Sequence, residues 1–235
     1  MKQAIWIVFL TLAAGAVAAA DEAHGDRPPF SDAGYWASVF DDPARHEWQR
    51  PGEVMRLLAI EHGDVVADLG AGTGYFTHPL SWSVGNTGKV FAVDVEQAML
   101  DHIKSREDIV QDVVQTILAT PDDPKLAPNL MDAILVVDTW HHLDRRKAYL
   151  DKLRAALRPS GRLVIIDYIE GELPVGPPPD HKLSRDEVVR EIESAGWTLA
   201  AESFVLPYQY FLMFHPPMKG VERPKFLSER DTKFK

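Results

Sequence analysis

The chain has 235 residues, of which 46% are hydrophobic and 26% are charged, so it holds enough apolar material for one well-packed globular core. Its 25 Lys and Arg residues are outnumbered by 35 Asp and Glu residues, and such a surface is poorly suited to neutralising nucleic-acid phosphates. Cysteine is absent, which excludes disulfides, thiolate catalysis and cysteine-ligated zinc. A small molecule is therefore a better candidate substrate than a nucleic acid.

The first twenty residues resemble an export signal. They read MKQAIWIVFLTLAAGAVAAA, with one Lys, then an apolar or small-residue run, then Ala18 and Ala20 in an A-x-A arrangement. This pattern is typical of a secretory signal peptide over residues 1–20 and predicts a periplasmic or secreted protein without stable membrane insertion after cleavage. The run over residues 4–20 also reaches the lower limit of a membrane span, so an uncleaved anchor is the alternative.

Residues 21–50 are polar but rich in aromatic side chains, among them Tyr35, Trp36, Phe40 and Trp48. We expect short helices here that pack over the entrance of a site as an N-terminal lid. At the other end, residues 215–235 are basic and polar, which predicts a loosely attached tail. A single domain over residues 51–214 remains between these segments.

Within this domain, strand and helix patterns alternate. Apolar runs predict strands at Val65–Leu69, Lys89–Asp94, Val113–Leu118, Asp132–Val137 and Arg162–Asp167. Helical patterns are expected at Pro51–Glu61, Tyr75–Trp82, Glu96–Ser105 and Asp144–Leu157, the last closed by the turn RPSG. Such alternation indicates an α/β fold, with a mostly parallel sheet covered by helices on both faces.

The last part of the domain has a different pattern. GELPVGPPPDHK contains too many prolines for regular structure and predicts a loop at the edge where strands end. Ser184 and Glu187 then form an S-x-x-E capping pattern for a helix to about Ala195. The final stretch, WTLAAESFVLPYQYFLMF, predicts two strands joined so closely that they must pair antiparallel.

The glycine-rich turn VVADLGAGTGYFT is the main ligand-binding signal. It follows a strand and precedes a helix, which is where α/β proteins bind nucleotides. The glycines are Gly70, Gly72 and Gly74, and Tyr75 stands where the third glycine of a dinucleotide-binding turn would fall. A nicotinamide-dependent oxidoreductase is therefore a less favoured alternative, and the chain has no phosphate-binding P-loop pattern.

Four successive segments carry a family resemblance: VVADLGAGTGYFT, VFAVDVEQAML, MDAILVVDTWHHL and LRPSGRLVIIDY. In order and separation they resemble the motifs of class I S-adenosylmethionine-dependent methyltransferases over roughly residues 51–214. The resemblance implies a Rossmann-like, doubly wound seven-stranded sheet, mostly parallel, with an antiparallel C-terminal hairpin. Among the members of this family, the chain most resembles those that act on small molecules, such as the quinone and arsenite methyltransferase groups. The arsenite activity is excluded because it needs cysteines.

The resemblance also implies a set of S-adenosylmethionine-binding residues. Asp94, 24 positions after Gly70, would accept hydrogen bonds from the ribose hydroxyls. Asp68 would receive the ammonium group or a water molecule, although it is equally suited to capping the turn. The full expected set is Asp68, Gly70, Ala71, Gly72, Gly74, Asp94, Val95, Asp122 and Asp138.

The adenine contact is less regular in this sequence. In LATPDDPKLAP, Asp122 or Asp123 stands where the family places an acid or amide that reads the adenine amino group. Prolines at 121, 124 and 128 shift the register, so a solvated loop is the alternative for both residues.

The segment VVDTWHHLD supplies the candidate catalytic residues. Asp138 leaves the fourth strand at the face where the transferred methyl should point, and His141 is the candidate general base or acceptor contact. His142 matches a position that often packs in related families. Adjacent histidines are a poor chelate, so no metal is expected. The sequence thus predicts a small-molecule methyltransferase; an exported S-adenosylmethionine-binding protein without turnover is the alternative, and the oligomeric state is open.

Overall fold

The structure is a computed structural model that describes residues 28–217. The predicted signal peptide and nearly all of the polar tail lie outside the described residues. Between residues 28 and 217, no helix has the length and apolar character required to cross a membrane.

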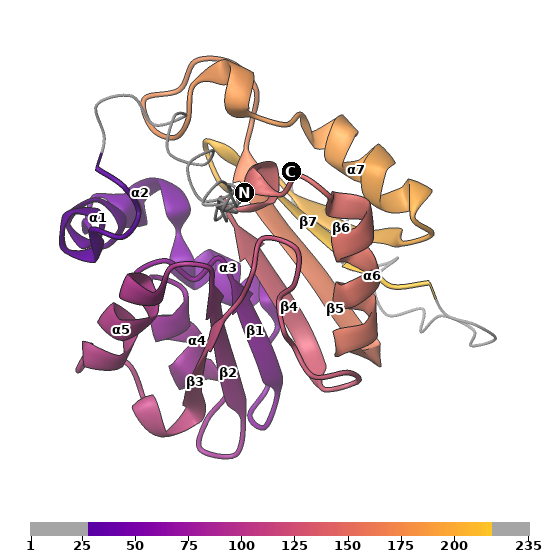
Figure 1. Cartoon of the computed structure of the whole chain (residues 1–235). Helices are drawn as coiled ribbons and strands as arrows, with labels where there is room; N and C mark the ends of the chain where they lie inside the picture. The colour runs from indigo at the N-terminus through magenta and orange to yellow at the C-terminus, as the bar shows by residue number, and fades with distance from the viewer. Residues whose placement is uncertain (1–27, 218–235) are drawn as a thin grey trace, which may run out of the picture.

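A seven-stranded sheet forms the centre of the molecule, in the order β3-β2-β1-β4-β5-β7-β6 (Figure 1). The five strands β1 to β5 pair in parallel, and β7 runs antiparallel to both β5 and β6. Their bounds are β1 Val65–Leu69, β2 Lys89–Asp94, β3 Val114–Leu118, β4 Met131–Val137, β5 Leu157–Tyr168, β6 Thr198–Ser203 and β7 Gln209–His215. This arrangement confirms the predicted fold class, including the antiparallel hairpin at the C-terminal end.

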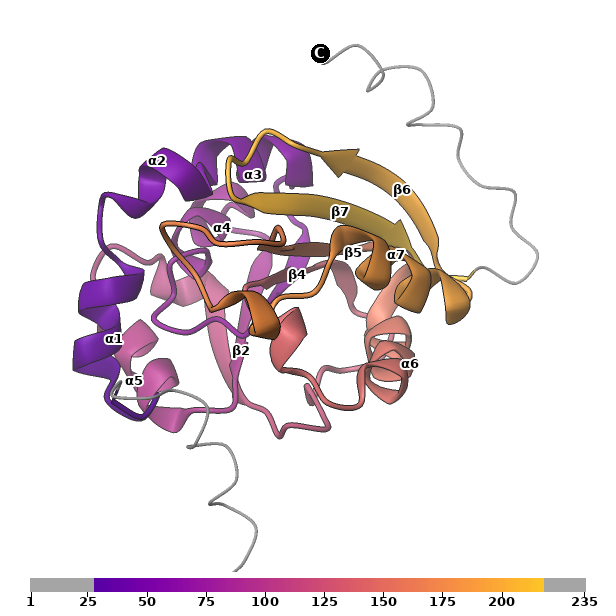
Figure 2. The same cartoon turned by 90° about the horizontal axis from the view of Figure 1, so that it is seen from above.

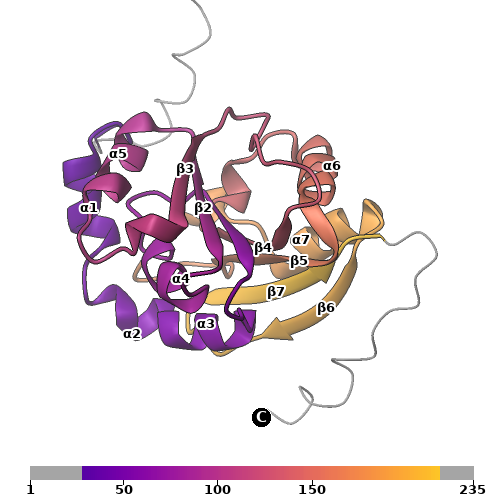
Figure 3. The same cartoon turned by 90° about the horizontal axis from the view of Figure 1, so that it is seen from below.

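Helices cover both faces of the sheet. Apolar side chains of α3, α4 and α5 pack on one face, and those of α6 and α7 pack on the other. The bounds are α3 Pro51–Leu58, α4 Thr77–Ser83, α5 Gln97–Ser105, α6 Arg146–Ala156 and α7 Arg185–Ser194. Viewed from below, β3 and β6 lie at the two ends of a twisted sheet (Figure 3). Burial on both sides explains why the central strands read as continuous apolar runs.

Two sequence predictions of local structure can be compared directly. The capping box of α7 is present, because the Ser184 hydroxyl accepts from the Glu187 amide and the Glu187 carboxylate accepts from the Ser184 amide. The prediction that RPSG forms a turn after α6 is wrong, because these four residues lie within β5. The strand β5 begins at Leu157, which pairs with Met131 before a register shift leads into the regular ladder from Arg162. Where strand pairing is irregular, as at the start of β5, the sequence does not show the regular alternation of apolar and polar residues that identifies a strand.

The carboxyl ends of β1 to β5 share one edge, and Figure 2 looks onto it. Two short helices lie beside this edge: α1 Ala33–Phe40 and α2 Arg45–Gln49. Trp36 anchors α1, because the residue is 3% exposed and its Nε1 donates to the Pro29 carbonyl at 3.1 Å. Its ring packs at a tilt against the Phe40 ring, 4.9 Å away between centroids. We refer to residues 28–50 as the lid.

Candidate active site

The loop after β1 turns sharply under the carboxyl edge. Its three glycines have positive φ angles, +73° at Gly70, +53° at Gly72 and +90° at Gly74, a conformation that side chains with a Cβ rarely adopt. A Cβ at Gly70 would overlap the Thr139 side chain, because the segment that follows β4 packs directly against the glycine loop. At Gly72 the nearest atoms belong to the Phe40 ring of the lid, 3.6 Å from where a Cβ would stand. The Phe40 ring of the lid therefore lies against the glycine loop at Gly72.

Asp68 stands near the carboxyl end of β1, just before this loop, and its carboxylate is buried. Its side chain accepts the Thr77 hydroxyl proton at 2.7 Å, and the residue is 3% exposed. Burial raises the pKa of the Asp68 carboxyl to about 6, because removing a carboxylate from water disfavours its charged form. A cation placed beside it would stabilise the ionised form.

Asp94 and Val95 lie where β2 ends, next to the glycine loop. One Asp94 oxygen accepts from the Gly72 amide at 2.8 Å, and the other accepts from the Glu96 amide at 2.9 Å. Burial raises the pKa of the Asp94 carboxyl, and these backbone amides oppose the shift. Val95 beside it is 50% exposed although apolar, while Ala71 is buried against α5. Asp94 and Val95 thus present a carboxylate next to an apolar surface.

These groups fit the parts of S-adenosylmethionine. Val95 would offer an apolar face for the adenine, Asp94 would offer two acceptor oxygens for the ribose hydroxyls, and Asp68 would offer a carboxylate for the ammonium group. A further observation points to a missing polar partner: the Tyr75 hydroxyl is buried and has no hydrogen-bond partner among the described residues. Tyr75 lies directly after Gly74, so its hydroxyl is a candidate contact for the bound group.

The lid is fastened to the carboxyl edge by a buried polar network. Arg45 of α2 contacts the Asp138 carboxylate at 3.5 Å and also donates to the carbonyl of Phe40 and the side chain of Gln49. Gln49 donates to Gln209 at 2.9 Å, and Gln209 in turn donates to Asp138. Burial raises the pKa of the Asp138 carboxyl to about 7, while Arg45 lowers it. Asp138 thus joins the lid to the ends of β4 and β7.

His141 is held by a carboxylate from the neighbouring strand. It lies in the short 3₁₀ helix η2 (Trp140–His142), and its Nδ1 contacts the Asp167 carboxylate at 2.8 and 2.9 Å. Asp167 is 1% exposed and also accepts from the Tyr168 amide at 2.8 Å. Asp167 and Asp138 raise the pKa of His141 against the opposing effect of burial. Among residues 28–217, no group forms a hydrogen bond with its Nε2.

The two adjacent histidines differ in environment. His142, expected to pack, is exposed instead, with its ring 4.1 Å from that of His141 between centroids. The short helix η2 explains this, because it turns the two consecutive side chains in different directions. Across residues 28–217 no group of three or more His, Asp or Glu side chains could hold a metal ion.

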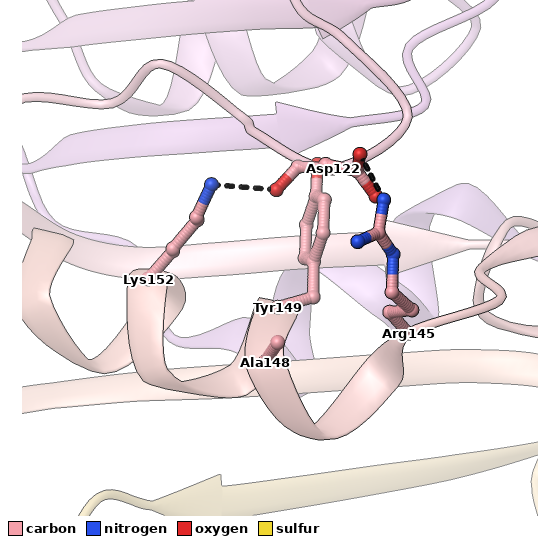
Figure 4. Close-up of a pocket in the computed structure, with 5 residues that line it drawn as sticks. All are labelled: Asp122, Arg145, Ala148, Tyr149 and Lys152. Atoms are coloured by element: carbon pink, nitrogen blue, oxygen red, sulfur yellow. Dashed lines mark hydrogen bonds and ion pairs between the residues drawn. The ribbon is translucent and has the colours of Figure 1, made fainter.

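Asp122 stands apart from the other candidate residues. Its carboxylate pairs with Arg145, and its carbonyl accepts from Lys152 at 2.7 Å (Figure 4). These residues line a pocket on α6 together with Ala148 and Tyr149. Asp123 likewise pairs with Lys152 at 3.0 Å. Both carboxylates are thus engaged at the surface of α6, and an adenine contact by either stays a prediction.

Four residues of the edge were absent from the sequence expectations: Arg45, Gln49, Asp167 and Gln209. Asp167 ends the predicted fifth strand, and the position of an acid at a strand end was a usable signal. The other three are contributed by the lid and by β7. Their contacts with Asp138 depend on tertiary structure and leave no local pattern.

The sheet order, the glycine loop and the acid at the end of β2 agree with what the resemblance to class I S-adenosylmethionine-dependent methyltransferases implies. Residues 67–165 match a family described as a methyltransferase domain. A crystal structure of an S-adenosylmethionine-dependent methyltransferase from Aquifex aeolicus is similar at a TM-score of 0.73 and 28% identity, covering 80% of this chain and 98% of that one. The expected fold, enzyme class and cofactor are therefore confirmed for this domain.

Curated relatives match a shorter part of the chain. An uncharacterized methyltransferase of Mycobacterium tuberculosis is 34% identical over 124 residues, 53% of this chain and 44% of the relative. A ubiquinone/menaquinone biosynthesis C-methyltransferase of Hydrogenovibrio crunogenus is 28% identical over 129 residues, 52% of this chain and 48% of the relative. The chain thus spans about half the length of the curated relatives it matches.

Proposed function

We propose that this protein transfers the methyl group of S-adenosylmethionine to a small-molecule acceptor. The observation that carries the proposal is the Asp94 carboxylate, which accepts from the Gly72 amide of the glycine loop and stands next to the exposed apolar side chain of Val95. This surface suits an adenosine, and the buried carboxylate of Asp68 suits an ammonium group on the same ligand. The similarity to ubiquinone/menaquinone biosynthesis C-methyltransferases supports a small acceptor.

Such a reaction requires little chemistry from the side chains of the protein itself. S-adenosylmethionine, when bound, supplies a methyl group already activated by a sulfonium. The protein must therefore hold the two reactants together and exclude water, which contributes several kcal/mol through proximity. The lid is placed for this role, because Arg45 and Gln49 bring α2 against Asp138 and Gln209 at the carboxyl edge.

Methyl transfer from labelled S-adenosylmethionine tests the proposal. The purified protein is incubated with the small-molecule fraction of its native cell, and label is sought in compounds other than the cofactor. We expect a labelled small molecule that is not formed by Gly72→Arg, whose side chain would start at a positive φ, meet the Phe40 ring and obstruct the glycine loop. Tight binding of S-adenosylmethionine without labelled product would instead favour a binding protein without turnover.

We also propose that the protein is exported to the periplasm or secreted, on the signal-like pattern of residues 1–20. Mass spectrometry of the protein from its native cell should find an N-terminus at or near Asp21. An intact Met1 in the membrane fraction would instead indicate an N-terminal anchor.

A further inference from the structure

Two consecutive residues of the lid contact two consecutive residues of the glycine loop. The Phe40 ring lies against Gly72, and the Asp41 carboxylate accepts a hydrogen bond from the Thr73 hydroxyl at 2.9 Å. Asp41 directly follows α1, and its amide donates to the Ala37 carbonyl of that helix at 2.9 Å. Thr73 is 1% exposed. The end of α1 therefore covers this part of the loop.

Arg106, the residue after α5, connects the same point to that helix. Its Nη1 donates to the Asp41 carboxylate at 3.1 Å and to the Thr73 carbonyl at 3.0 Å. Its Nε and Nη2 donate to the two oxygens of Asp108 at 2.9 and 2.6 Å, which fixes the guanidinium. The Nε2 atom of His102 lies 3.7 Å from the other oxygen of Asp41. Asp41 thus joins the lid to α5, and α1 lies beside α5 in two views (Figures 2 and 3).

This contact differs from the other fastening point of the lid. Arg45 pairs with Asp138, which belongs to the expected cofactor-binding set, whereas Asp41, Thr73 and Arg106 do not belong to it. The contacts of Asp41 can therefore form both with and without a bound cofactor. The side chains of Asp41 and Arg106 are 25% and 15% exposed, and an ion pair that retains contact with water is modest in strength and weakened by salt.

We propose, resting on the methyltransferase function above, that Asp41 holds the lid closed over the glycine loop and that its contacts break whenever the cofactor enters or its demethylated product leaves. The Gly72 amide donates to the Asp94 carboxylate, and the Phe40 ring lies against the same glycine. A ligand that binds at this carboxylate must therefore pass the end of α1. Asp41 controls how fast the cofactor exchanges and takes no part in the methyl transfer.

The proposal concerns rates more than affinity. Because the contact forms with and without the cofactor, weakening it makes the lid open more often in both states. Association and dissociation then become faster together, and Kd changes little. A contact made only around a bound cofactor would affect dissociation alone, and a contact that only stabilised the fold would change neither rate.

Surface plasmon resonance on the immobilised protein measures both rates for S-adenosylhomocysteine, which carries no net charge near neutral pH. Asp41→Asn keeps an acceptor for the Thr73 hydroxyl and removes the charge. We expect both rate constants to rise roughly threefold to fivefold, with a change in Kd of less than about twofold. Asp42→Asn is the matched control in the lid, because Asp42 is exposed and accepts from the Ala44 amide, and it should leave both rates unchanged.

Three further measurements distinguish an ion pair from a merely structural role. Added salt should speed both rates of the wild-type protein, and this salt effect should be largely lost in Asp41→Asn. The effect of Asp41→Asn should be smaller in an Arg106→Gln background, because the two side chains act on each other. Hydrogen exchange of the protein without added ligand should be faster at the amides of α1 in Asp41→Asn, and unchanged in Asp42→Asn.

The outcomes separate this inference from the proposed function. Unchanged rates in Asp41→Asn, or faster dissociation with unchanged association, would overturn the role of Asp41 while leaving a methyltransferase. Failure of the wild-type protein to bind S-adenosylhomocysteine would overturn the proposed function itself. If circular dichroism shows that Asp41→Asn does not fold, Arg106→Lys takes its place. It keeps the charge but loses the planar fork that binds Asp41, Thr73 and Asp108 together, so both rates should again rise, and unchanged rates would overturn the proposal.

Discussion

Replacement of the buried Asp68 by Asn should stabilise the ligand-free protein while weakening the cofactor site. The pKa of the Asp68 carboxyl is raised from 3.8 to about 6, so the folded state favours the protonated form. The stabilising effect of that proton is fully present below pH 3.8 and is lost as the pH rises through about 6. At pH 7.5 the charged carboxylate therefore costs about 3 kcal/mol, at 1.36 kcal/mol for each pKa unit.

Asn is neutral and similar in shape, and its carbonyl oxygen can replace the oxygen that accepts from Thr77. Its amide protons need partners, which costs roughly 1–2 kcal/mol, so we expect a net gain of about 1–2 kcal/mol in the free energy of unfolding at pH 7.5. The cost of the wild-type carboxylate falls to about half at pH 5, and the advantage of Asn should shrink with it.

Urea denaturation at the two pH values measures the effect of Asp68→Asn, with Asp151→Asn as an exposed control. Calorimetry on the same protein should show weaker binding of S-adenosylhomocysteine, because the carboxylate that would receive the ammonium group is gone. The reasoning is refuted if Asp68→Asn is equally destabilised at both pH values, or if its advantage does not depend on pH.

Two further changes test the loop and the lid. Gly70→Ala should cost about 2–4 kcal/mol in the free energy of unfolding, because its Cβ would overlap Thr139 at a positive φ. Gly52→Ala, in α3 with open space around it, should be neutral or stabilising by thermal denaturation, and equal losses in both variants would contradict the explanation. Arg45→Ala should cost about 1–3 kcal/mol and speed proteolysis within the lid, since it removes the cation beside Asp138. An unchanged cleavage rate would show that Arg45 does not fasten the lid.

The central strands were predictable because burial on both faces leaves a strong signal. The bounds of β1 and β2 agree with the expected Val65–Leu69 and Lys89–Asp94, since each is an apolar run ended by a turn. The S-x-x-E pattern at Ser184 likewise identified its helix, because a capping box is a local interaction.

The polar contacts of the site depended on parts of the chain that are distant in sequence. Arg45 meets Asp138 across 93 residues, and the partner of His141 is Asp167, 26 residues later on the next strand. The exposure of His142 followed from the short helix η2, which a run of two histidines does not reveal. Such pairings are set by strand register and by the position of the lid.

The central claim is that the edge around Gly72, Asp94 and Val95 binds S-adenosylmethionine. Isothermal titration calorimetry of the purified protein with S-adenosylmethionine, S-adenosylhomocysteine and NAD tests it most directly, with Gly72→Arg as the blocked control. We predict one site for each of the first two ligands, no binding of NAD, and loss of both signals in Gly72→Arg. Equal affinity for NAD, or no binding of either adenosyl ligand by the wild-type protein, would contradict the account.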